Sequence, residues 1–75
     1  MTYYPGRCRL RQILKEQRKT QKWLSEKTGI DKYRISYYSN DRGFMHLSTA
    51  KTIAAALNCS IDDLYDWIYV GGGLE

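Results

Sequence analysis

The stretch TQKWLSEKTGIDKYRISYYS, residues 20–39, contains the signals for two short helices joined by a tight turn. Thr20 has a side-chain oxygen that can accept a backbone N–H at a helix N-terminus, so it predicts the start of the first helix. Gly29 can adopt the left-handed conformation that ends a helix. Asp31 can then cap a second helix that begins at Lys32. The stretch therefore predicts two helices separated by a turn of about three residues.

Apolar side chains in this stretch are placed to hold the two helices against each other. The positions expected to point inward are Leu24, Ile30, Ile35 and Tyr38, with the small Ser25 where the helices approach closely. The outer face of the second helix then carries Lys32, Tyr33, Ser36 and Tyr37. Two short helices that cross after a tight turn make a helix-turn-helix.

The residues and their spacing resemble the lambda-repressor-like family, the Cro/cI-type or XRE-type helix-turn-helix proteins. The matching segments are T-Q-x-x-L-S-x-x-T-G-I at residues 20–30, I-S at 35–36, TAKTIAAALN at 49–58 and SIDDL at 60–64. They cover most of the chain, from about Arg9 to Tyr65, in the family's order. The resemblance implies a sequence-specific regulator that binds double-stranded DNA, in particular a prokaryotic or phage repressor that acts as a homodimer on a two-fold symmetric operator.

The resemblance also implies which residues meet DNA. In this family the second helix of the motif enters the major groove, where base edges differ in their hydrogen-bond donors and acceptors. The base-reading candidates carried over are Lys32, Tyr33, Ser36 and Tyr37. The phosphate-contacting candidates are Gln21, Lys22, Arg34, Asn40 and Arg42. The alternative role for each is a solvated helix face or, for the tyrosines, core packing.

Three features depart from the family pattern. Similar proteins often pair an Arg of the first helix with a Glu late in the second helix of the motif, and the matching residues here are Leu14 and Ser39. Both charges are absent together, so neither is left without a partner. Asp31 stands where Ser or Thr is more common, and S-N-D-R-G at residues 39–43 replaces the usual E-N-G.

Positive charge is concentrated in the first part of the chain. Residues 1–42 contain eleven Lys or Arg and four acidic residues, a net charge of +7, whereas residues 43–75 have a net charge of −3. A one-sided basic surface is typical of proteins that bind a polyanion. A solvated basic face is the alternative, but the basic half coincides with the helix-turn-helix, which favours nucleic acid.

The helical periodicity predicts one all-α domain over residues 1–70 with five helices and no sheet. The resemblance implies that these helices form a compact lambda-repressor-like fold. Pro5 and Gly6 interrupt regular structure, so residues 1–6 are expected to form an arm. Ser60 is expected to cap the last helix. The five helices are expected at about residues 7–18, 20–28, 32–39, 47–58 and 60–68. The inward side chains outside the motif are Leu10, Ile13, Leu14, Gln17, Ala50, Ile53, Ala54, Leu57, Ile61, Leu64 and Tyr65, with Phe44, Met45 and Leu47 folded against them.

The chain continues beyond this core with four large apolar residues. Trp67, Ile68, Tyr69 and Val70 are too many to leave exposed on one small domain, so we expect them to form a homodimer contact. The alternative is that Trp67 and Ile68 cover the first helix of the same chain. The alternative function is an antitoxin or adaptor that uses this end, or the tyrosine-rich face, to bind a protein partner. GGGLE, residues 71–75, looks like a cloning linker.

Several other classes of function are not supported by the sequence. Cys8 and Cys59 are expected to be reduced structural thiols rather than a disulfide. His46 is the single histidine and has no neighbouring nucleophile or carboxylate pair, so we expect no enzyme, no metal site, no cofactor and no small-molecule ligand. No apolar run approaches the roughly 20 residues that span a bilayer, and no signal peptide is evident. We therefore expect a cytoplasmic, nucleoid-associated protein without a membrane segment.

Overall fold

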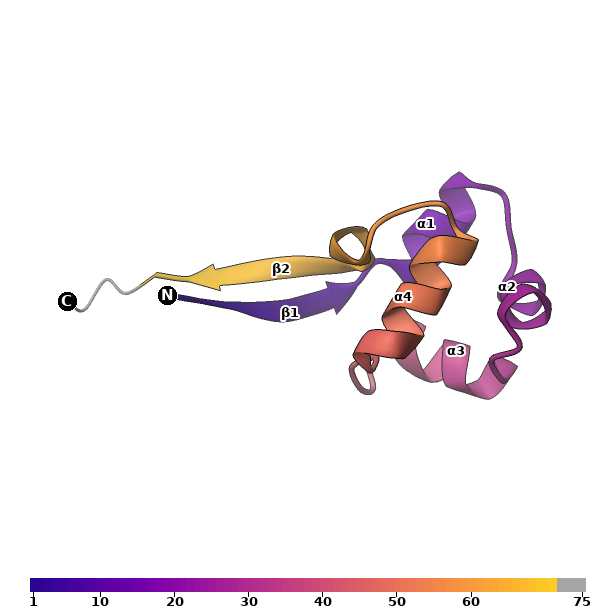
Figure 1. The fold of residues 1–75 in the computed structure, drawn as a ribbon, viewed down its shortest axis with the longest axis horizontal. Coiled ribbons are helices and arrows are strands. Elements are labelled where there is room, and N and C mark those ends of the chain that lie inside the picture. The colour runs from indigo at the N-terminus through magenta and orange to yellow at the C-terminus, as the bar shows by residue number, and fades with distance from the viewer. Residues whose placement is uncertain (72–75) are drawn as a thin grey trace.

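The computed structural model describes residues 1–71, in which four α-helices and a 3-10 helix form one body and two strands project from it (Figure 1). The molecule measures 48 × 21 × 19 Å. Of the proposed linker, residues 72–75 lie outside the described residues. The elements are β1 (Thr2–Cys8), α1 (Leu10–Glu16), α2 (Gln21–Thr28), α3 (Lys32–Ser39), α4 (Leu47–Ala56), η1 (Ile61–Leu64) and β2 (Tyr65–Val70).

The helices α2 and α3 begin and end where the sequence predicts. Thr20 Oγ1 accepts a hydrogen bond from the Trp23 N–H at 3.0 Å, and Gly29 has a left-handed φ of 78°. Ser25 Oγ donates to the Ile30 carbonyl at 2.6 Å, which closes the turn between the helices. Asp31 stands at the N-cap of α3, but its side chain accepts no hydrogen bond there. The predicted bounds of the two helices are confirmed. The prediction that the Asp31 side chain caps α3 is wrong, because it accepts no hydrogen bond there.

The core lies among the helices and packs against the end of β1 and the start of β2. Leu10, Leu24, Ile35, Ile53 and Leu57 are fully buried, in agreement with the predicted inward positions. Burial of each such side chain stabilises the fold by about 1.5–3 kcal/mol. The remaining buried apolar residues are Cys8, Ile13, Leu14, Tyr38, Ala50, Ala54, Leu64 and Tyr65, and Ile30, Met45 and Ile61 are partly buried against them.

Three side chains expected inside lie largely outside. Phe44 and Leu47 are 63% and 76% exposed, so the prediction that both fold against the core is wrong. Phe44 instead meets the edge of the Tyr65 ring, with the centroids 5.9 Å apart. Gln17 is exposed, although its amide donates to the Leu57 carbonyl at 2.7 Å. The loop is held instead by Tyr65, whose buried hydroxyl accepts the Met45 N–H at 3.1 Å.

The prediction of five helices without a sheet is wrong. β1 and β2 form an antiparallel pair in which Thr2 faces Val70 and Tyr4 faces Ile68, and we call this pair the ribbon. The expected arm at residues 1–6 is therefore a strand. The expected last helix ends as a 3-10 turn at Leu64, because the β-branched and aromatic residues that follow favour an extended backbone once a partner strand is present.

Trp67 and Ile68 therefore do not cover α1, as one reading of the sequence had suggested. They lie opposite Pro5 and Tyr4 in the ribbon, and they are 40% and 53% exposed. The Trp67 indole N–H donates to the Asp62 carbonyl at 3.1 Å, which ties the ribbon to η1.

Pro5 and Gly6 lie inside β1 rather than ending regular structure. The register is irregular between Pro5 and Cys8. Pro5 is tolerated because both strands of a two-stranded sheet are edge strands, where an N–H can be missing. A Cβ atom on Gly6 would clash with the Asp66 carbonyl oxygen of β2, so the glycine permits the close approach of the strands.

The start of α1 is displaced by the same strand. Arg7 and Cys8 continue β1, and the Arg9 N–H donates to the Leu64 carbonyl at 2.7 Å. The helix therefore begins at Leu10 and not at residue 7. No helix among residues 1–71 combines the length and the apolar character that a bilayer crossing requires.

Asp41 connects the ribbon to the helix pair. It follows α3 with a left-handed φ of 61°, a conformation that costs a non-glycine residue about 1–3 kcal/mol. Its carboxylate oxygen Oδ1 accepts the Cys8 backbone N–H at 2.6 Å. The Cys8 side chain is buried beside it, which raises the pKa of the thiol, and both Cys8 and Cys59 are free. Asp41 thus fixes the end of β1 against the end of α3.

Replacing Asp41 should test this connection. Asp41→Ala keeps the left-handed strain and leaves the Cys8 N–H without its acceptor, so we expect a loss of about 1–3 kcal/mol in the free energy of unfolding. Asp41→Asn keeps an acceptor oxygen and tolerates the left-handed conformation, and it should lose less than about 1 kcal/mol. Urea unfolding followed by circular dichroism measures both. Equal stability of Asp41→Ala and the wild type would show that the hydrogen bond contributes nothing.

Candidate nucleic-acid interface

The four predicted base-reading residues lie together on the outer face of α3. Lys32 and Tyr33 are exposed in the first turn, and Tyr33 is 81% exposed. Ser36 is half-buried one turn later, and Tyr37 is 48% exposed. Ile35 is buried on the opposite side of the helix, so the packing of α3 determines which face meets solvent.

Tyr37 is held in place by its surroundings. Its ring meets the edge of the Tyr38 ring, with the centroids 5.7 Å apart and the planes at 76°. The same ring lies over Gly43, where an added Cβ would come within 2.6 Å of the Tyr37 ring. Gly43 therefore provides the space in which Tyr37 lies, and the loop after α3 determines where this side chain points.

Gln21, a predicted phosphate contact, ties the start of α2 to the end of α3. Its amide nitrogen donates to Ser39 Oγ at 3.1 Å, and Ser39 Oγ donates to the Ser36 carbonyl at 3.1 Å. Ser39 and Leu14 are both buried. They occupy the two positions at which similar proteins often have a charge pair, so a hydrogen-bonded hydroxyl and an apolar side chain replace the two charges. Lys22 is exposed in the same turn of α2. The first turn of α2 is thereby fixed relative to the outer face of α3.

Asn40 continues the outer face of α3 and links it to α1. Its amide nitrogen donates to Ser36 Oγ at 3.2 Å, and its amide oxygen accepts a hydrogen bond from the Arg11 guanidinium. Arg11 was not among the sequence candidates for the interface. Its position on the outer face of the first helix was visible, but its contact with Asn40 depends on how α1 lies across α3, which the sequence pattern does not specify.

The other two phosphate candidates lie apart from this network. The Arg34 side chain lies along its own helix towards Tyr38, one turn later. Its guanidinium donates to the Tyr38 hydroxyl at 3.3 Å and lies 6.0 Å from the centroid of that ring. Arg42 is exposed in the loop after α3, beside Asp41. The structure therefore brings Asn40 to the base-reading face, while it turns Arg34 towards Tyr38.

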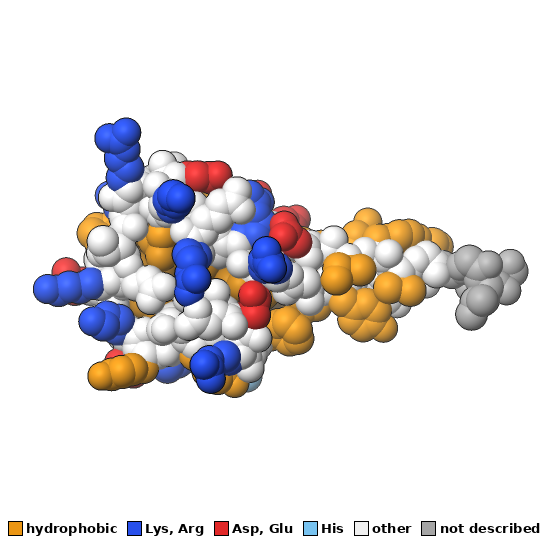
Figure 2. All heavy atoms as spheres, turned by 180° about the vertical axis from the view of Figure 1, so that it is seen from behind, with side chains coloured by type: hydrophobic (Ala, Val, Ile, Leu, Met, Phe, Trp, Pro, Cys, Tyr) orange, Lys and Arg blue, Asp and Glu red, His pale blue; other side chains and the backbone are white. Residues whose placement is uncertain are grey.

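Charge is divided between the two parts of the molecule. Lys and Arg side chains lie over the helical body in Figure 2, whereas hydrophobic side chains gather on the outer part of the ribbon, where no Lys, Arg, Asp or Glu side chain is seen. Residues 1–5 and 67–70 contain no Asp, Glu, Lys or Arg. A polyanion would therefore be attracted to the helical body and the base of the ribbon, and not to the outer part of the ribbon.

The described residues offer no arrangement suited to a metal ion. Within residues 1–71 no three His, Cys, Asp or Glu side chains are grouped where they could hold one. His46 is exposed at the N-cap of α4. The hydrogen bonds from the Ser60 backbone N–H and hydroxyl lower the pKa of Asp63, which identifies this carboxylate as the structural partner of the turn before η1.

Comparison with known proteins agrees with this geometry. Residues 9–69 match the model of the Cro/C1-type HTH DNA-binding domain. The chain belongs to this family. The matched region runs from the residue before α1 into β2, so it includes the whole helix-turn-helix and all four base-reading candidates of α3. The family expected from the sequence is confirmed.

Two relatives from Bacillus subtilis (strain 168) are similar over most of their length. The "SPbeta prophage-derived uncharacterized HTH-type transcriptional regulator YopS" is 40% identical over 63 residues, which cover 83% of this chain and 85% of the relative. A protein of the same description, YotL, is 38% identical over 64 residues, which cover 84% of this chain and 80% of the relative.

The position of Tyr37 can be tested without DNA. Gly43→Ala should push the Tyr37 ring away from the loop, because the added methyl group occupies its place. The ring is half-exposed and can rotate, so we expect a loss below about 1 kcal/mol in the free energy of unfolding. NMR should show altered ring resonances for Tyr37 and unchanged methyl resonances for Ile53 in the core. Unchanged Tyr37 resonances would mean that the ring does not rest on Gly43.

Proposed function

We propose that this protein is a sequence-specific double-stranded DNA-binding transcriptional regulator, a repressor of prokaryotic or phage origin, that reads the major groove with α3. The observation that carries the proposal is the outer face of the recognition helix of a Cro/C1-type domain, where Lys32, Tyr33 and Tyr37 are exposed and Ser36 is half-buried between them. The transcriptional regulators to which the chain is similar are described as derived from a prophage, which supports a phage origin.

The hydrogen bonds around α3 support a division between base reading and anchoring. Gln21 and Asn40 stand at opposite ends of the motif, and both are tied to the end of α3. Contacts to phosphates set the register of a protein on DNA, and contacts to base edges provide the sequence preference. Because both anchors are fixed to the helix that reads bases, a phosphate contact at either end would place Ser36 and Tyr37 at a defined depth in the groove.

The proposal is tested by selection of short duplex DNA with the purified protein at low and near-physiological salt. We expect a symmetric motif with half-sites about one helical turn apart, and binding that weakens as salt rises. Tyr37→Ala should relax the preference at one position of each half-site by roughly ten-fold or more. Gln21→Ala should weaken binding to all sequences alike.

Two controls accompany this selection. Lys51→Ala removes an exposed charge of α4 and should leave sequence preference unchanged. Thermal unfolding of Gln21→Ala shows whether loss of the Ser39 hydrogen bond destabilises the fold. Weaker DNA binding by a variant of unchanged stability indicates loss of a phosphate contact. Enrichment of no motif, with binding that disappears as salt rises, would contradict sequence-specific regulation and favour the alternative of a protein-interaction module.

We further propose that the protein binds its operator as a homodimer through the ribbon, with Trp67, Ile68, Tyr69 and Val70 in the contact. The ribbon is apolar and exposed, and β1 adds two side chains that the sequence analysis did not include. Tyr3 and Tyr4 are 64% and 54% exposed, and the Tyr3 ring lies 4.9 Å from that of Tyr69.

A second copy is the partner that fits this surface. An isolated two-stranded sheet is marginally stable in water, so additional strands or a facing sheet would stabilise it. The outer part of the ribbon has no charged side chain, so the side chains of two identical copies meet there without repulsion between like charges. A self-complementary contact of this kind gives the two-fold symmetry that a symmetric operator requires.

Lysine substitutions in the ribbon should abolish the dimer. Ile68→Lys and Tyr69→Lys, tested separately, should sediment near the monomer mass of 8.8 kDa at concentrations where the wild type sediments near twice that mass. Leu47→Lys is the matched control, since Leu47 is an exposed apolar residue of α4 outside the ribbon. A wild type that stays monomeric both alone and on DNA would rule out this contact and leave the ribbon as a surface for another protein.

A further inference from the structure

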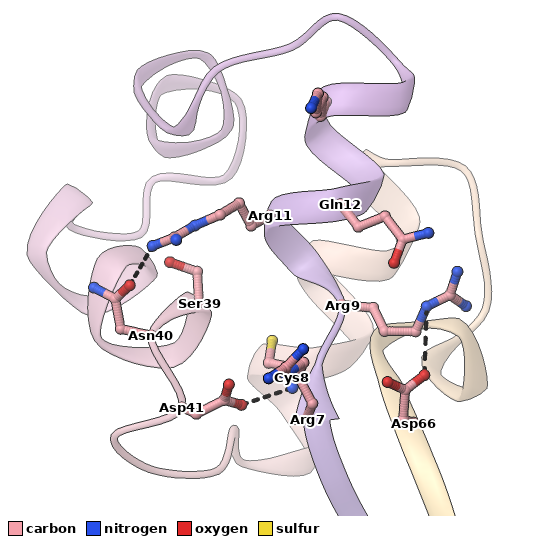
Figure 3. A pocket seen from close by; sticks show the side chains of 10 residues that line it. Arg7, Cys8, Arg9, Arg11, Gln12, Ser39, Asn40, Asp41 and Asp66 are labelled. Carbon is pink, nitrogen blue, oxygen red and sulfur yellow. Dashed lines mark hydrogen bonds and ion pairs between the residues drawn. The ribbon is translucent and has the colours of Figure 1, made fainter.

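We propose that a hollow between α1, the end of α3 and the base of the ribbon binds a phosphate group of the DNA backbone, and that Arg7, Arg11 and Lys15 provide the charge. This inference rests on the proposed DNA-binding function and extends the interface beyond the helix-turn-helix. Figure 3 shows the side chains that line the hollow. Its volume is about 660 Å³. It is lined by Arg7, Cys8, Arg9, Arg11, Gln12, Lys15, Ser39, Asn40, Asp41 and Asp66.

The hollow has an excess of positive charge that the protein itself does not neutralise. Four of its lining residues are basic and two are acidic. Asp66 is paired with Arg9 at 3.7 Å, and Asp41 accepts the Cys8 backbone N–H. Within the described residues neither Arg7 nor Lys15 forms an ion pair with a carboxylate. These two cations are therefore available for an anion from outside.

Arg11 adds further donors to the same hollow. A guanidinium group has five N–H donors, and within the described residues Arg11 uses one of them in a hydrogen bond to the neutral amide oxygen of Asn40. Planar, charged donors of this kind match the oxygens of a phosphate. Arg11 can therefore keep its contact with Asn40 and still donate to a phosphate beside it.

The hollow is continuous with the base-reading face of α3. Ser36, a base-reading candidate, accepts a hydrogen bond from Asn40, and Asn40 accepts one from Arg11. These two hydrogen bonds connect Ser36 in α3, through Asn40 at the end of that helix, to Arg11 in α1. A DNA strand whose phosphate is contacted by Asn40 therefore passes the mouth of the hollow, where Arg7, Arg11 and Lys15 meet the neighbouring phosphate.

The composition of the hollow favours the DNA backbone over a base. None of its ten lining residues is aromatic, so it has no surface on which a base could stack. Its lining combines charged donors with small polar groups, which suits phosphate oxygens. The contact should therefore contribute to affinity for any DNA sequence and not to the choice among sequences.

Charge-removing substitutions test this inference. Arg7→Gln and Lys15→Gln should each weaken binding to the selected operator and to an unrelated duplex by the same factor, about five-fold at 0.15 M salt, and should lower the slope of log K against log salt by about 0.9. Lys51→Gln is the matched control, because it removes one exposed positive charge from α4, away from the hollow. Arg11 is left intact, since its loss would also release Asn40.

The outcomes separate this inference from the proposed function. If the wild type binds DNA and Lys15→Gln and Lys51→Gln have equal affinities and salt slopes, the phosphate contact in the hollow is contradicted. The proposed DNA-binding function would stand. Absence of duplex binding by the wild type would overturn the proposed function and the inference with it. Thermal unfolding shows whether Arg7→Gln is still folded. If it is not, the affinity and salt slope of Lys15→Gln alone test the phosphate contact.

A titration with inorganic phosphate distinguishes the source of the phosphate group. NMR at low salt should show no saturable shifts of the Arg11 and Asn40 resonances at millimolar phosphate, because a single free phosphate lacks the register that the DNA backbone provides. Saturable shifts at micromolar phosphate that disappear in Lys15→Gln would overturn the DNA source in favour of a free phosphate ligand.

Discussion

The geometry of the turn between α2 and α3 is the constraint on which the rest of the structure depends. Gly29 takes the left-handed conformation, and the Ser25 hydroxyl closes the turn on the Ile30 carbonyl. With the turn fixed, Leu24 and Ile35 meet in the core, and the opposite face of α3 is left in solvent. The exposure of the base-reading candidates is thus a consequence of core packing. A change in the crossing of these helices would rotate Tyr33 and Tyr37 out of the interface.

A second layer of polar contacts joins the other elements to α3. Gln21 reaches Ser39 from α2, Arg11 reaches Asn40 from α1, and Asp41 holds the Cys8 N–H of β1. All three contacts end within three consecutive residues at the end of α3. This short segment therefore sets the positions of α1, α2 and the ribbon relative to the recognition helix. It also explains how a non-glycine residue is retained at a left-handed position, since the Asp41 hydrogen bond offsets part of the strain.

The sequence predicted the parts of the fold that local signals determine. The Thr20 cap, the Gly29 turn and the spacing of Leu24 and Ile35 are readable within a few residues, and the helix pair has the predicted bounds. The ribbon was missed because Tyr4 and Ile68 are far apart in the chain, and neither strand shows its partner in a local pattern. Ser60 indicated the start of a last helix, whereas the pairing of Trp67 with Pro5 determined the extended backbone that follows. At the site, exposed residues of α3 were predictable from periodicity, but the Arg11 contact required the crossing of α1 on α3.

The separation of charge within one small chain suggests how binding and assembly can coexist. A net positive helical body repels a second copy of itself, and this repulsion opposes dimer formation wherever two bodies approach. The ribbon carries the apolar surface away from that body, to the far end of a molecule that is 48 Å long (Figure 1). Two copies that meet through their ribbons would keep their basic bodies apart, and duplex DNA would neutralise the charge of each. The projecting ribbon, which the helical pattern did not predict, would therefore make a basic DNA-binding surface compatible with the proposed self-association.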